Sequence, residues 1–151
     1  MAEKQYVVFK IGNEEYGIDI MNVKEIGPYQ KSVKVPNAPV FVEGIINYRG
    51  NVIPIISLHK RFNIEQKDID NNTRIIVINL KDKQIGFIVD EASQTIRLDD
   101  KDIDPAPDIV TGIDSKYITG VGKLDERLII LVDLEKILTE EEKKEIESME
   151  V

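Results

Sequence analysis

The residues that could do chemistry are few in this chain. His59 is its only histidine, and cysteine is absent. A catalytic triad or a zinc site needs more nitrogen and sulfur ligands than one imidazole supplies. The sequence also contains no GxxxxGK[ST] loop and no GxGxxG motif for binding phosphates. We therefore expect no enzyme activity, no cofactor and no bound metal, and we expect His59 to cap a strand end or to lie on the surface.

Carboxylates are the remaining source of catalytic groups. The chain has 28 acidic residues against 20 Lys and Arg, for a formal net charge of −8. One acidic stretch, residues 99–108, lacks the turn glycine and closing glutamate of a calcium loop, so we expect a solvated loop there. A pair of acid and base carboxylates leaves no signature in a sequence. A small carboxylate-based hydrolase therefore stays open as an alternative.

The best candidate for a binding site is a single cationic position. Arg49 directly follows Tyr48, in what we expect to be a hairpin turn, in an otherwise acidic chain. A solvated turn arginine is the simpler interpretation, but an arginine beside an aromatic residue is also a combination that anchors interfaces. Met21, Val23 and Ile26 follow the first predicted hairpin. They either pack in the core or form an exposed partner site.

The elements that must position these residues occur twice. Tyr6–Val23 match Ile75–Ala92 at a shift of 69 positions, with apolar residues on apolar residues and a glycine at the same place. Gly44–Leu58 match Gly120–Leu134 at a shift of 76. One small β unit is therefore predicted to have been built twice. This arrangement predicts two similar modules with a surface between them.

Short apolar runs with turn signals between them predict small antiparallel barrels rather than a parallel sheet. The predicted hairpins pair 6–11 with 15–20, 41–47 with 52–58, 74–80 with 84–89, and 116–124 with 127–132. We expect a short strand at 95–98, helical turns at 58–62 and 133–138, either a helical turn or an extended edge at 21–26, and a linker at 63–73. Thr139 and Glu142 form a capping box that predicts a C-terminal helix.

These elements suggest a division into a first barrel at 1–66, a second barrel at 67–133, and a helical segment at 134–151 that packs on the barrels. Modules of roughly 65–70 residues are marginal alone, so we expect the two barrels to share a core or to brace each other.

Charge and hydropathy exclude several classes of partner. An acidic surface repels phosphate backbones, which argues against a nucleic-acid-binding barrel. The first residues lack a signal-peptide profile, and the longest apolar run, Leu128–Val132, is far shorter than a membrane span. The absence of cysteine suits a reducing compartment. We therefore expect a cytoplasmic protein without direct membrane contact.

Four segments together resemble the CheW family of bacterial chemotaxis coupling proteins. They are Glu14–Ile26, Val35–Phe62, Asn72–Ser93 and Tyr117–Leu138, and the most diagnostic piece is Gly44–Ile55, with its N-x-R-G turn and I-P-I run. The resemblance implies an all-β fold of two five-stranded Src homology 3-like barrels packed together. It also implies a non-catalytic adaptor that couples transmembrane chemoreceptors to the histidine kinase CheA. The same domain acting in a non-chemotaxis two-component system is an alternative.

The resemblance further implies a receptor-binding groove between the barrels. In the family, the arginine of the N-x-R-G turn belongs to this groove, which places that role on Arg49, with Tyr48 beside it. Ala92 and Thr95 match positions on a strand beside the groove, and they are small or polar where relatives carry valine. The expected ligand is the cytoplasmic tip of a methyl-accepting chemoreceptor.

A second surface is implied for the kinase. In the family it lies on the first barrel, after the first hairpin. The matching residues here are Val23, Lys24 and Glu25, with Gly44 nearby. The expected partner is the regulatory domain of CheA, which is itself a homologue. The free chain is expected to be a monomer that reaches membrane receptor arrays through its partners.

Overall fold

The computed structural model describes residues 3–62, 64–65, 68–80, 83–105, 117–138 and 144. The strands are β1 (Lys4–Ile11), β2 (Glu14–Asp19), β3 (Glu25–Pro28), β4 (Val42–Tyr48), β5 (Asn51–Ser57), β6 (Arg74–Leu80), β7 (Lys83–Val89), β8 (Glu91–Leu98), β9 (Ile103–Asp104), β10 (Ile118–Leu124) and β11 (Arg127–Val132). The helical elements are α1 (Leu58–Phe62) and the 3-10 turns η1 (Ile20–Asn22), η2 (Asp100–Asp102) and η5 (Leu134–Lys136).

The four predicted hairpins and the helical turns at 58–62 and 133–138 are confirmed. Residues 21–26 hold both predicted alternatives, because η1 ends at Asn22 and the edge strand β3 begins at Glu25. The solvated loop expected at 99–108 contains regular structure in its first part, where Asp99 caps η2 and β9 follows. β8 starts at Glu91, four residues before the predicted strand. The predicted C-terminal helix and its capping box lie outside the described residues.

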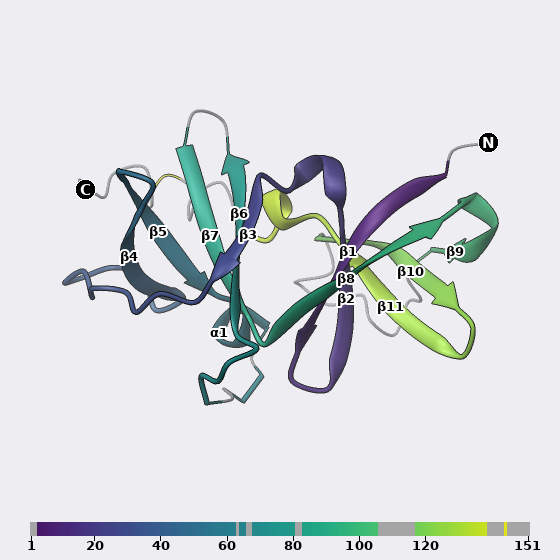
Figure 1. Cartoon of the computed structure of the whole chain (residues 1–151), viewed down its shortest axis with the longest axis horizontal. Coiled ribbons are helices and arrows are strands. Elements are labelled where there is room, and N and C mark those ends of the chain that lie inside the picture. The colour runs from purple at the N-terminus through teal and green to yellow at the C-terminus, as the bar shows by residue number, and fades with distance from the viewer. Residues whose placement is uncertain are drawn as a thin grey trace.

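The strands form two sheets that lie side by side (Figure 1). We call the six-stranded sheet, with order β8-β1-β2-β11-β10-β9, sheet A, and the five-stranded sheet, with order β3-β6-β7-β5-β4, sheet B. Sheet A exceeds the expected five strands because the two-residue β9 is added at its edge. The all-β class with two packed β modules is as predicted.

The boundary expected between residues 66 and 67 does not separate the two sheets. Sheet A combines β1 and β2, purple in Figure 1, with the green strands β8 to β11, and sheet B likewise takes strands from both halves. Each sheet is joined in its middle by a parallel pair, β2 with β11 and β5 with β7. Local patterning predicts hairpins but not which hairpins pair with each other, and so it missed this exchange.

The repeat is preserved in the pairing register. Gly17 pairs with Leu131 in sheet A, and Gly86 pairs with Ile55 at the equivalent place in sheet B. A Cβ atom would lie 2.9 Å from the Leu131 side chain at Gly17 and 2.6 Å from the Ile55 side chain at Gly86. Both glycines are therefore required by close packing against the parallel neighbour. Each sheet contains one hairpin from each copy of the β unit.

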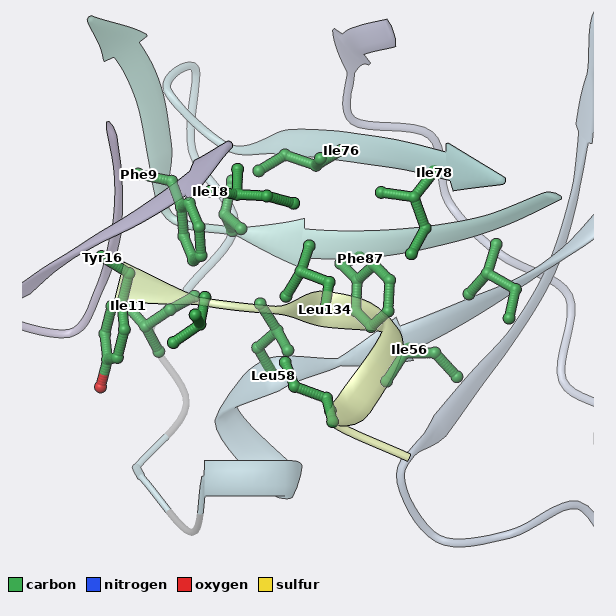
Figure 2. Packing of buried hydrophobic residues seen from close by; sticks show 14 of the residues in the cluster. Phe9, Ile11, Tyr16, Ile18, Ile56, Leu58, Ile76, Ile78, Phe87 and Leu134 are labelled. Atoms are coloured by element: carbon green, nitrogen blue, oxygen red, sulfur yellow. The ribbon is translucent and has the colours of Figure 1, made fainter. Parts of the chain in front are cut away.

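Three apolar clusters fill the molecule. The largest lies between the sheets and takes alternate residues of equivalent strands, such as Phe9 from β1 and Ile78 from β6 (Figure 2). The opposite faces of these strands supply Val8 and Val77 to separate clusters inside sheet A and sheet B. Strands buried on both faces read as continuous apolar runs, which explains the sequences of β1 and β6.

A buried polar group joins the two sheets where the chain passes from β7 into β8. Asp90 Oδ2 accepts a hydrogen bond of 2.7 Å from the Gly12 amide, in the β1–β2 turn, and lies 3.0 Å from His59 Nε2 in α1. His59 is only 3% exposed, so the prediction of a surface or strand-capping histidine was wrong. Its burial depends on a carboxylate 31 residues later, which no local pattern reveals.

Candidate partner-binding site

The cationic position predicted from the sequence forms the turn between β4 and β5. Tyr48 pairs with Asn51, which leaves Arg49 and Gly50 as a two-residue loop. Both have positive φ, 51° and 87°, as a type I′ hairpin turn requires. The Asn47 side chain accepts a hydrogen bond of 3.0 Å from the Gly50 amide and supports the turn. The N-x-R-G motif therefore fixes the backbone that presents Arg49.

Arg49 is held in a bidentate ion pair with Glu25 of β3. Its Nε donates to Glu25 Oε1 at 2.9 Å and its Nη2 donates to Oε2 at 2.8 Å. The Tyr48 hydroxyl donates to the same Oε1, and the guanidinium lies 5.6 Å from the centre of the Tyr48 ring. This geometry resembles the fork recognition that favours arginine over lysine.

The pair also joins the two edges of sheet B. β3 and β4 are the outermost strands of this sheet, yet Glu25 of β3 contacts Tyr48 at the end of β4. Sheet B must therefore curl until its edges approach each other. Tyr29 and Tyr48 pack against the cluster inside the sheet near this contact. The curled shape agrees with the barrel expected from the resemblance.

Electrostatics keep both members of the pair ionised. Hydrogen bonds from Arg49 and then from Tyr48 hold the pKa of Glu25 below its usual value. The hydrogen bond to Glu25 likewise raises the pKa of Arg49. Burial, followed by the hydrogen bond to Glu25, raises the pKa of the Tyr48 hydroxyl. Tyr48 therefore remains a neutral donor to a carboxylate at neutral pH.

The ion pair borders a shallow cleft of about 170 Å³. The cleft combines an apolar floor with charged and polar walls, and its lining residues are Glu25, Gly27, Pro28, Gln30, Ile46, Tyr48, Arg49, Ile75 and Val77. The Arg49 side chain is 67% exposed. Its hydrogen bonds to Glu25 use Nε and Nη2, and a guanidinium carries further donors on Nη1. Among the described residues, none accepts a hydrogen bond from Nη1. A ligand can therefore bind this nitrogen of a guanidinium that Glu25 already holds in a fixed orientation.

The structure groups the predicted site residues differently from the sequence. Glu25, expected at the kinase surface, is bonded directly to Arg49 and Tyr48, expected at the receptor groove. Lys24 is exposed and its backbone amide donates to Val77. Val23 is half-buried against the cluster between the sheets. The two predicted surfaces therefore meet at Glu25.

The other predicted residues lie away from the ion pair. Ala92 and Thr95 are on β8 in sheet A, where Ala92 packs against the inter-sheet cluster and Thr95 is exposed opposite Val7. Gly44 is buried at a bulge between β4 and β5. A Cβ there would lie 2.3 Å from the carbonyl oxygen of Val33, so Gly44 allows residues 29–41 to pack on β4.

Sequence reasoning missed a second arginine-centred group, in sheet A. Arg127 Nη2 donates to Glu15 Oε2 at 2.8 Å and to Gln94 Oε1 at 2.7 Å. Gln94 pairs with Val8 at the place where Glu25 pairs with Val77 in sheet B. The repeat register was the available signal, because a shift of 69 carries Glu25 onto Gln94.

The arrangement at Arg49 is suited to binding, because it presents an exposed, oriented cation beside a cleft. Among the described residues, no cluster of three or more His, Cys, Asp and Glu side chains could hold a metal ion. His59 and Asp90 are paired with each other in the interior, away from the cleft at Arg49. No helix among the described residues is long and apolar enough to cross a membrane. The fold and the site define a protein-binding module made of two exchanged β units.

Comparison with known proteins identifies the family of this module. The model of the CheW-like domain matches residues 5–142. The chain is 41% identical to the chemotaxis protein CheW of Klebsiella aerogenes, over 92% of this chain and 84% of that protein. It is 36% identical to the chemotaxis protein CheW of Treponema pallidum, over 96% and 88% of the two chains.

A solved structure agrees with these relatives. The scaffolding protein TtCheW from Thermoanaerobacter tengcongensis superimposes with a TM-score of 0.83 and 37% identity, over 92% of this chain and 90% of that one. The chain belongs to the CheW family, which consists of non-catalytic chemotaxis adaptors, and it is not an enzyme. These findings do not favour the hydrolase alternative.

Proposed function

We propose that this protein couples transmembrane chemoreceptors to the histidine kinase CheA, and that Arg49 is a receptor contact. The oriented and exposed guanidinium at the cleft is the observation that carries the proposal. The chain is similar over most of its length to chemotaxis proteins, and the similar solved structure is that of a scaffolding protein. The protein then reaches the membrane receptor array from the cytoplasm through its partners.

The receptor tip, a helical hairpin, is proposed to lie in a groove that runs from Arg49 past the half-buried residues between the sheets. Val23, just before β3 of sheet B, and Ala92, on β8 of sheet A, pack on the same inter-sheet cluster. A helix presents apolar residues along one face, and half-buried apolar side chains suit that kind of ligand. Arg49 would fix the orientation of the helix by pairing with a carboxylate or a carbonyl oxygen.

The kinase surface is proposed to include Lys24 and Glu25, with Val23 beneath them and Gly44 nearby. Lys24 is exposed, and its backbone is fixed by the hydrogen bond to Val77. Because Glu25 bonds to Arg49, a receptor that draws Arg49 away frees a carboxylate at the kinase surface. Each partner then changes the affinity for the other, as linkage requires.

The test compares Arg49→Ala with Arg127→Ala, a matched control that removes an arginine paired with glutamate in the other sheet. Receptor binding is measured by co-sedimentation with a chemoreceptor cytoplasmic fragment, and kinase binding by calorimetry with the CheA regulatory domain. We expect Arg49→Ala to weaken receptor binding by about tenfold or more, as for an interface arginine. Arg127→Ala should leave it unchanged.

Thermal unfolding of each variant separates binding from folding. Receptor binding that is unchanged in Arg49→Ala would remove Arg49 from the receptor site. Loss of both binding activities together with a lowered unfolding temperature would make Arg49 a structural residue. Glu25→Gln keeps the shape of the side chain but removes its charge, and it shows whether the ion pair or the arginine alone is required.

A further inference from the structure

The connection between β3 and β4, residues 29–41, differs in charge from its counterpart in the second copy. It contains two lysines, Lys31 and Lys34, and no acidic residue, within a chain of net charge −8. The counterpart between β8 and β10, residues 99–117, contains six aspartates and two lysines. The same connection in the repeated unit has therefore become basic in one copy and acidic in the other. We call residues 29–41 the basic connection.

Among the described residues, the lysines near this edge of sheet B make no ion pair within 4.0 Å. Lys24, Lys31 and Lys34 are exposed, and none has a carboxylate within 4.0 Å among the described residues. Elsewhere in the described chain, lysines do pair with carboxylates, as Lys60 pairs with Glu43 at 3.1 Å. Unpaired cations in an acidic protein produce a local field that attracts anionic partners.

The basic connection is held in place rather than loose. The Val33 amide donates to the Ile45 carbonyl at 2.9 Å, and the Ile45 amide donates back to Val33 at 2.9 Å. Gly44 has no side chain to obstruct this contact. Two further turns are closed by backbone hydrogen bonds, from Ala38 to Val35 and from Val42 to Pro39. A fixed backbone presents the lysines with little ordering cost on binding.

Apolar side chains accompany the charges. Val33 is 67% exposed and Val40 is 83% exposed, which is unusual for branched apolar residues in a chain whose other valines are mostly in the core. An interface that combines apolar contact area with charges at its rim has the composition of a protein-binding surface. A nucleic acid would not use the valines, and the charge of the whole chain opposes it.

We propose that the basic connection binds an acidic, partly apolar protein surface, and that within the proposed function this surface belongs to the CheA regulatory domain. The connection is continuous with the proposed kinase surface, because Val33 packs on Gly44 and Lys24 directly precedes β3, the strand from which the connection leaves. Gly44 is itself buried and is therefore a positioning residue, which acts on the kinase through Val33. This inference rests on the proposed function.

The test reverses the charges with the double variant Lys31→Glu and Lys34→Glu. Binding to the CheA regulatory domain is measured at about 50 mM and about 300 mM salt, because screening separates charge attraction from apolar contact. We expect the double variant to bind about tenfold more weakly at low salt, with a smaller loss at high salt, as for rim charges. The affinity of the neutral variant, Lys31→Gln with Lys34→Gln, should lie between that of the double variant and that of the unchanged protein.

Lys101→Glu is the matched control, since Lys101 is exposed on the counterpart connection. It should change kinase affinity by less than about twofold, as a charge outside the interface does. The double variant could bind the kinase domain with the same affinity and salt dependence as the unchanged protein. That result would overturn the proposed role of the basic connection and leave the proposed function standing. Failure of the unchanged protein to bind the kinase domain would instead overturn the proposed function.

Folding of the variants is checked by thermal unfolding and circular dichroism. The lysine side chains make no ion pair with described residues, so unfolding temperatures should stay the same. If the double variant were unfolded, the neutral variant would show whether the lysines take part in binding, through the salt dependence of its affinity for the kinase domain. A reduced salt slope in that variant supports the proposal, and an unchanged slope contradicts it.

Discussion

The two copies of the β unit have the same backbone and different surface chemistry. Arg49 and Asp125 stand at equivalent turns with φ angles of 51° and 56°. Gly44 and Gly120 both lie against a neighbouring segment, close to Val33 in one copy and to Ile103 and Asp104 in the other. The copies thus share the glycines and turns that shape the chain, but only the first carries a cation at its hairpin tip.

The difference shows which parts of the unit were free to change. Core positions match between copies, as Phe9 and Ile78 do in the inter-sheet cluster, because both faces of their strands are buried. Edge strands and connections face solvent, and their side chains diverge from Glu25 to Gln94 and from a basic to an acidic connection. Duplication therefore gave one fold with two surfaces, available for two different partners.

The largest expected effect comes from separating the copies. Residues 1–66 alone should not fold, because each sheet needs hairpins from both halves. The fragment loses the parallel pairs and the shared core, a loss that exceeds the roughly 5–15 kcal/mol stability of a typical domain. Near-ultraviolet circular dichroism and amide spectra should show an unfolded chain. Co-expression with residues 67–151 should restore the fold.

Cooperative unfolding of the isolated 1–66 fragment would contradict the exchanged architecture. It would favour the division expected from the sequence, in which each half is its own barrel. The 1–66 fragment could instead fold only when the 67–151 fragment is present and forms a complex with it. That result would confirm that the two halves share the sheets.

An intermediate effect is expected at the passage between the sheets. Asp90→Ala leaves the Gly12 amide and His59 without their buried partner, and each loss is typically about 1–3 kcal/mol. The equivalent position in the first copy is Met21, which is 85% exposed. Met21→Ala should therefore change the free energy of unfolding by less than about 0.5 kcal/mol.

Urea denaturation at neutral pH measures both variants. We expect Asp90→Ala to lower the free energy of unfolding by about 2–4 kcal/mol, less than the sum of two separate losses, because water can reach part of the site. Asp90→Asn keeps an acceptor oxygen, so its free energy of unfolding should lie between those of Asp90→Ala and the unchanged protein. A change below about 0.5 kcal/mol for Asp90→Ala would mean that the buried group does not hold the sheets together.

The sequence was a good guide to local structure and a poor guide to long-range pairing. Turn residues and short apolar runs predicted the hairpins, and burial of β6 on both faces explains why its apolar run is continuous. The exchange of hairpins was not predicted, since periodicity carries no information on pairing across the chain. Arg49 was singled out by its position, but its pairing with Glu25, 24 residues earlier, has no local signature.

The smallest expected effect tests whether the ion pair that distinguishes the first copy is held in solution. The hydrogen bonds from Arg49 and Tyr48 place the pKa of Glu25 below its ordinary value of 4.5. Since the pKa is lower in the folded state, Glu25 contributes its full stabilisation above the ordinary value, and this contribution is lost as pH falls through the lowered pKa. Glu25→Gln should therefore differ in stability from the unchanged protein at neutral pH, and the difference should shrink in acid.

Carboxyl carbon chemical shifts of Glu25, followed with pH by nuclear magnetic resonance, measure this directly. In Arg49→Ala the pKa of Glu25 should rise toward its ordinary value, because the hydrogen bond that lowers it most is removed. Arg127→Ala should leave it unchanged, since Arg127 bonds to Glu15 and Gln94 in sheet A. An ordinary pKa for Glu25 in the unchanged protein would show that Arg49 is free in solution. The two copies would then differ in the charge at their hairpin tips but not in how rigidly the tips are held, and the proposed link between receptor and kinase through Glu25 would lose its physical basis.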